Sequence, residues 1–156
     1  MPETYVQSID ILLVEDNPGD VRLIRETLKN SKIHNNVIVV NNGEEALAYL
    51  YRRDRYRDAV RPDLILLDLN LPKKGGYEVL VQVKEDSQLK HIPIVVLTSS
   101  RVEEDILKTY NLHANCFISK PIGLEQFCAV VNTIESFWLS IVKLPKDTPL
   151  GSAGKN

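Results

Sequence analysis

Residues Leu64–Pro72, LILLDLNLP, carry the signal that decides the fold. A run of Leu and Ile without polar alternation is typical of a strand that is buried on both faces, as central strands of parallel α/β sheets are. Asp68 is therefore predicted to lie at the carboxyl end of a central strand. Ligands bind outside the carboxyl ends of strands in open α/β sheets, so the position favours a chemical role. The alternative is a carboxylate that only caps the following turn.

Three other apolar runs also end in polar side chains. They are Ile9–Val14, followed by Glu15 and Asp16; Ile94–Thr98, which ends in a hydroxyl; and Cys116–Ser119, followed by Lys120. Parallel strands bring such ends to one edge of a sheet. We therefore expect an acidic pair, a further acid, a hydroxyl and an ammonium group to lie together at that edge.

Helical patterns separate these runs. Asn17-Pro18 is typical of a helix start, with Asn as the cap and Pro in the first position. Asn30 and the polar HNN at 34–36 are expected to end this helix, and Val37–Val40 is expected to be a short buried strand. Further helices are predicted at 43–53, 77–85, 102–112 and 124–142.

The alternation of strands and helices predicts an α/β fold, a doubly wound (βα)₅ domain with a five-stranded parallel sheet and helices on both faces. We place this domain at residues 9–143, after a polar lead-in at 1–8 and before a tail at 144–156 that we expect to be disordered. Gly75-Gly76 is expected to let the backbone turn before the helix at 77–85. The alternating charges of 52–61 indicate a solvated helix end and loop.

The composition predicts one small cytoplasmic domain. The chain has 156 residues, 44% of them hydrophobic, and a formal net charge of −2, with Lys and Arg scattered along it. Such a balance does not predict a positively charged surface that would bind nucleic acid or an anionic membrane. The sequence shows neither a membrane span nor a signal peptide. Cys116 and Cys128 show no metal-ligand spacing and fit buried free thiols.

Three acids at one sheet edge require a counter-charge. Glu15, Asp16 and Asp68 would repel one another near neutral pH, so a proton or a cation must lie between them. Carboxylates, a main-chain carbonyl and water suit Mg²⁺, which is often shared with phosphate oxygens. Lys120 would add positive charge, Thr98 a hydroxyl donor, and Asp68 a carboxylate nucleophile. This set is that of an aspartyl-phosphate site.

The same residues, in this order, resemble the response regulator receiver domain of two-component systems, a flavodoxin-like fold. The resemblance covers nearly the whole chain. It lies in Glu15-Asp16 after the first strand, Asp68 within LLDLNLP, Thr98 within VLTSS and Lys120-Pro121 within FISKP. Each motif is weak by itself, and the four together are specific.

The resemblance implies a phosphoacceptor signalling protein with slow autodephosphorylation. Asp68 would accept a phosphoryl group from a histidine kinase, and Thr98 and Lys120 would contact the phosphoryl oxygens. Mg²⁺ would be held by Glu15, Asp16, Asp68 and the main-chain carbonyl of Asn70. Glu15 stands where the family more often has Asp, which bears on the metal geometry.

Further roles follow from the same resemblance. Asn70 and Ser100 would flank the phosphoryl group and tune its lifetime, and Thr98 and Phe117 would form the switch. An ordinary core aromatic is the alternative for Phe117. Within the family, the chain is similar to the small single-domain regulators paired with cyanobacterial phytochromes, on the strength of YLYRRDRYRDAVRPDLILLDLNLPKKGGYEVL at 49–80 and SFWLSIVKLP at 136–145. Output would then pass through protein–protein contact.

Two other classes share parts of the pattern. A haloacid-dehalogenase-like phosphatase also forms an aspartyl-phosphate, but Asn70 stands where such an enzyme needs a second Asp as its proton carrier. A flavodoxin-like flavin protein needs a phosphate-binding loop after the first strand, where Glu15-Asp16-Asn17 would repel phosphate. The phosphatase is the second candidate.

The predicted last helix carries more apolar side chains than one sheet face needs. Phe137, Trp138 and Ile141 have no obvious partner within the chain and predict a symmetric homodimer. The alternative is that these residues fold back beneath the domain.

Overall fold

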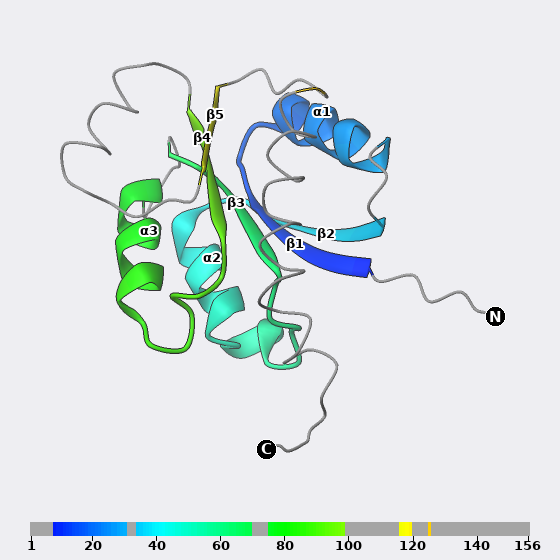
Figure 1. Cartoon of the computed structure of the whole chain (residues 1–156). Coiled ribbons are helices and arrows are strands. Elements are labelled where there is room, and N and C mark those ends of the chain that lie inside the picture. Colours follow the sequence, from blue (N-terminus) through cyan, green and yellow to red (C-terminus); the bar gives the residue numbers. More distant parts are fainter. Residues whose placement is uncertain (1–7, 31–33, 70–74, 99–115, 120–124, 126–156) are drawn as a thin grey trace, which may run out of the picture. The chain divides into compact units, whose positions relative to one another are not determined.

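A computed structural model describes residues 8–30, 34–69, 75–98, 116–119 and 125. These ranges contain a five-stranded parallel sheet with the strand order β2-β1-β3-β4-β5 (Figure 1). The strands are β1 (Ser8–Val14), β2 (His34–Val40), β3 (Leu64–Asp68), β4 (Ile94–Thr98) and β5 (Cys116–Ser119). The chain runs outward from β1 to β2 and then crosses back to β3, so the order reverses between β1 and β3. The predicted doubly wound parallel sheet is confirmed.

Three α-helices are described: α1 (Pro18–Lys29), α2 (Gly43–Leu50) and α3 (Gly76–Glu85), with a short 3₁₀ helix, η1, at Asp54–Tyr56. The described strands and helices belong to a unit at 1–124, and of the unit at 125–156 only Glu125 is described. The helices predicted at 102–112 and 124–142 and the tail at 144–156 lie outside the described residues. Within the described ranges, none of the helices has the length and apolar character that crossing a bilayer requires.

β3 is buried on both faces, as its sequence predicts. Every residue from Leu64 to Asp68 is buried. Ile65 and Leu67 pack in one cluster with apolar residues of α2 and α3, whereas Leu64 and Leu66 point to the opposite face. α2 and α3 lie beside each other, apart from α1 (Figure 1). β3 is therefore covered on both of its faces.

β2 is longer and less buried than predicted. It begins at His34 instead of Val37, because the whole of β1 pairs with it, from Ser8 beside His34 to Val14 beside Val40. As an edge strand it exposes one side, so the polar HNN is tolerated. The Asn36 amide donates to Asp10 Oδ1 at 3.3 Å, which ties this polar end to β1.

The segment after α2 is more ordered than a solvated loop. α2 ends at Leu50, short of the predicted 53, because Arg52 and Asp54 take left-handed backbone conformations with φ of 56° and 53°. Tyr49 is buried beneath Tyr56, with ring centroids 5.3 Å apart in an edge-to-face contact. The Tyr49 hydroxyl donates to the Val60 carbonyl at 3.0 Å and fixes the return to β3.

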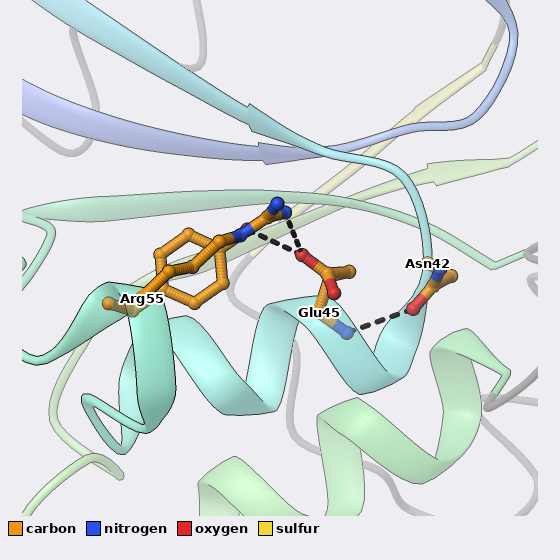
Figure 2. Close-up of polar contacts among 4 residues, drawn as sticks. Asn42, Glu45 and Arg55 are labelled. Carbon is orange, nitrogen blue, oxygen red and sulfur yellow. Dashed lines mark hydrogen bonds and ion pairs between the residues drawn. The ribbon is translucent and has the colours of Figure 1, made fainter.

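Glu45 on α2 also contacts the segment that follows this helix. Its backbone N–H donates to Asn42 Oδ1 at 2.8 Å, and its carboxylate is paired with Arg55. Figure 2 shows both contacts. The Arg55 guanidinium also lies over the Tyr56 ring, 4.8 Å from the centroid. These contacts tie the turn to α2.

Candidate functional site

Glu15 and Asp68 meet at the ends of the two adjacent strands where the sheet order reverses. β1 and β3 pair in register up to Val14 beside Leu67, and one further residue in this register places Glu15 beside Asp68. Both side chains are buried, with exposed fractions of 0% and 2%. Two neighbouring buried carboxylates are costly to keep ionised unless positive charge lies close to them.

Asp16 completes an acidic group at this point. One carboxylate oxygen each from Glu15, Asp16 and Asp68 lies within 4.8 Å of the others. Glu15 and Asp68 form the buried part of the group, whereas Asp16 is exposed. One side of the group is therefore buried in the protein and the other side faces solvent. Three carboxylate oxygens at this spacing fit a cation such as Mg²⁺ or Mn²⁺ that also keeps water ligands.

The loop that carries Glu15 and Asp16 is fixed by backbone and capping contacts. The Glu15 N–H donates to the Val40 carbonyl at 3.0 Å, which extends the β1–β2 ladder past the end of the strand. Asn17 donates its backbone N–H to Glu15 Oε2 at 3.2 Å and accepts from the Asp20 N–H at 3.0 Å through its side chain. The Asn cap predicted for α1 is thus present, and the backbone N–H of the same residue holds the Glu15 carboxylate.

The edge of the sheet continues from Asp68 to Thr98. Asp68 pairs with Leu97, so Thr98 lies one residue beyond it on β4. Thr98 in turn pairs with Ser119 at the end of β5. The backbones of three of the four predicted strand ends therefore lie in consecutive places along the edge, and the fourth, β5, stops one residue before Lys120.

For several predicted site residues the structure describes only the backbone or nothing at all. For Thr98 and Phe117 the description covers their place in β4 and β5 and not their side chains. The others lie outside the described residues: Asn70, Ser100, Lys120, Phe137, Trp138 and Ile141.

Gly75-Gly76 serves a purpose different from the predicted one. Gly75 has an ordinary extended backbone with φ of −74°, and among the described residues no glycine has a positive φ. The chain therefore enters the helix here without the left-handed backbone conformation that favours glycine. At Gly76 the reason for glycine is space, since a Cβ would lie 2.5 Å from the Asp68 carbonyl oxygen and 2.6 Å from the Leu69 Cα. A glycine close after the strand that carries Asp68 was the only signal for this in the sequence.

The chain is similar to known response regulators over most of its length. The family described as the response regulator receiver domain matches residues 11–132. Response regulator Rcp1 of Synechocystis sp. is 49% identical over 135 residues, which is 86% of this chain and 92% of that protein.

Solved structures agree with this match. The phosphorylated cyanobacterial phytochrome response regulator RcpA is 53% identical with a TM-score of 0.72, covering 86% of this chain and 96% of the other. The Mn²⁺-bound form of Rcp1 is 47% identical with a TM-score of 0.70, covering 85% and 96%. The match decides between the candidate classes in favour of the receiver over the phosphatase. The chain belongs to the family of response regulator receiver domains.

Proposed function

We propose that this chain is a Mg²⁺-dependent phosphoacceptor that receives a phosphoryl group on Asp68 from a histidine kinase. The observation that carries the proposal is the buried placement of Asp68 beside Glu15, with Asp16 at the exposed side of the same group. Asp68 is the member that ends the central strand, which makes it the acceptor, and Glu15 and Asp16 are assigned to metal binding.

The proposed transfer is a displacement at phosphorus. An Asp68 carboxylate oxygen forms a bond to phosphorus as the P–N bond to the kinase histidine breaks, and the released imidazole keeps the electron pair and takes up a proton. Mg²⁺ bound by Glu15, Asp16, Asp68 and the Asn70 carbonyl would neutralise charge on the phosphoryl oxygens. Thr98 and Lys120 are proposed to contact those oxygens directly.

The proposed reaction needs an acceptor carboxylate that is shielded from water and a solvent-exposed side from which the kinase can approach. Asp68 is only 2% exposed, so water has little access to its carboxylate. Asp16 is exposed, so a kinase can approach from that side. Asn70 and Ser100 are proposed to control the entry of hydrolytic water and so the lifetime of the phosphoryl group.

A phytochrome-type histidine kinase is the proposed partner. The support is the similarity to RcpA, which is described as a phytochrome response regulator. The protein is proposed to work in the cytoplasm and to signal by protein contact. Thr98 and Phe117 are proposed as the switch, and Phe137, Trp138 and Ile141 as a homodimer surface, which sedimentation of a Phe137→Ala/Trp138→Ala variant would test.

Labelling with acetyl phosphate tests the proposed function. The wild type should gain a phosphoryl group that is stable in acid and labile in base, and only when Mg²⁺ is present. EDTA should prevent labelling, and excess Mg²⁺ should restore it. Labelling that proceeds equally in EDTA would contradict the role of the acidic group.

A further inference from the structure

We infer that Gly76 is a positioning residue for the phosphoacceptor: the absence of a side chain at 76 lets α3 sit directly on the Asp68–Leu69 peptide and hold the Asp68 carboxylate within reach of Glu15 and Asp16. This inference rests on the proposed function. It adds a role to a residue that touches neither metal nor phosphate.

At Gly76 the first residue of α3 meets the end of β3 through backbone atoms. The Gly76 N–H donates to the Leu69 carbonyl at 3.4 Å. A Cβ at 76 would come within 2.5 Å of the Asp68 carbonyl oxygen, closer than real Cβ contacts occur. Any side chain at 76 must therefore push the helix and the strand end apart.

Neither partner in this contact moves easily. α3 is anchored by Val79, Leu80 and Val83, all with exposed fractions of 0%. On the other side, Asp68 is paired with Leu97 in the sheet and the Leu69 N–H donates to the Leu97 carbonyl at 3.4 Å. Close-packed cores transmit such a strain instead of absorbing it. The nearest of the displaced atoms is the carbonyl oxygen of Asp68 itself, so the strain is expected to reach the Asp68 carboxylate.

Gly75 provides a matched control. It lies one residue earlier in the same junction, and a Cβ there would meet nothing nearer than Glu78 Oε1 at 3.9 Å, an ordinary contact. Its φ of −74° suits any residue. Gly75→Ala and Gly76→Ala thus add the same methyl group on either side of one peptide bond, and only the second presses on Asp68.

The experiment measures Mn²⁺ affinity by calorimetry, together with stability by urea unfolding. Gly76→Ala should bind Mn²⁺ roughly 10- to 100-fold more weakly, the loss that supporting residues of a metal site cause, and should label more slowly with acetyl phosphate. Gly75→Ala should bind at the wild-type value. Wild-type affinity in a folded Gly76→Ala protein would overturn the inference. Failure of the wild type and of Gly75→Ala to bind or label would instead overturn the proposed function.

A second measurement uses the wild type and so does not depend on the folding of a variant. If the junction positions Asp68 for the cation, linkage requires that the cation also stabilise the junction. Hydrogen exchange of the Gly76 amide, followed by NMR, should therefore slow when Mg²⁺ is added, by a larger factor than that of the Val83 amide. Equal changes at the two amides would contradict the coupling.

Discussion

Glu15 and Asp68 lie side by side, one residue beyond the Val14–Leu67 pair that ends the β1–β3 ladder, and both carboxylates are buried. The sheet therefore brings two acids together that are 53 positions apart in the chain. Such a pair is unfavourable for folding and useful for binding a divalent cation. The acidic edge is best explained as a site whose charge is balanced by bound metal.

The first prediction concerns metal-linked stability. At a Mg²⁺ concentration of about 100 times its Kd, the free energy of unfolding of the wild type should rise by about 2.7 kcal/mol. Glu15→Gln removes one ligand charge with little change in shape, and a roughly tenfold higher Kd would reduce that gain to about 1.4 kcal/mol. Urea unfolding with and without Mg²⁺ measures both values.

The control is Glu26→Gln, which removes an exposed carboxylate from α1. This variant should keep the full Mg²⁺-dependent gain. If Glu15→Gln kept it too, Glu15 would not be a metal ligand.

The second prediction separates two helix caps. Asn17 and Asn42 each accept a backbone N–H at the start of a helix. Asn17 accepts from Asp20 at 3.0 Å. Asn42 accepts from Glu45 at 2.8 Å, and Figure 2 shows this second cap. Replacing either by Ala should cost about 1 kcal/mol of stability. Only Asn17 also holds the segment that bears Glu15, so Asn17→Ala alone should weaken Mg²⁺ binding.

Calorimetric titration of both cap variants with Mg²⁺ checks this difference. Equal Mg²⁺ affinities in the two would show that the loop at 15–17 does not need its cap to bind metal.

The third prediction concerns acid stability. The Tyr51 hydroxyl donates to Asp86 Oδ2 at 2.8 Å, and this bond, followed by that from the Gln88 N–H, lowers the pKa of Asp86 below its ordinary value of 3.8. A depressed folded pKa contributes stability that is present above the unfolded pKa and is lost as the pH falls through the folded pKa. The stability difference between wild type and Tyr51→Phe should therefore be constant above pH ~5 and shrink below pH ~4.

Tyr49→Phe is the matched control, because the Tyr49 hydroxyl donates to a neutral partner, the Val60 carbonyl. Its cost, about 1 kcal/mol for one hydrogen bond, should not change over the same pH range. Urea unfolding from pH 3 to 7 compares the three proteins. A Tyr51→Phe difference that stays constant down to pH 3 would show that Asp86 gains nothing from the bond.

The central sheet and the position of Asp68 could be predicted from the sequence because a strand buried on both faces needs apolar residues at every position. β3 is apolar at every position before its acid, and that pattern has few structural meanings. The start of β2 was missed because an edge strand buries only one side, so His34 and its polar neighbours look like loop.

Contacts between distant segments were not predictable in the same way. The closeness of Gly76 to Asp68 depends on where α3 packs, and a glycine in the sequence looks the same whether it supplies flexibility or space. Tyr49 lies beneath Tyr56 because Arg52 and Asp54 turn the chain back, in backbone conformations that neither residue type usually takes. The spacing of Tyr49 alone did not show that contact.

The position of the phosphoryl group tests the central claim most directly. Wild-type protein labelled with acetyl phosphate and Mg²⁺ would be reduced with borohydride, which converts an aspartyl-phosphate to homoserine, and the modified residue would be located by peptide mass spectrometry. We predict homoserine at position 68 alone and no label in Asp68→Asn, which keeps the shape of the side chain and removes the nucleophilic oxygen. Modification at Glu15 or Asp16, or normal labelling of Asp68→Asn, would contradict the account.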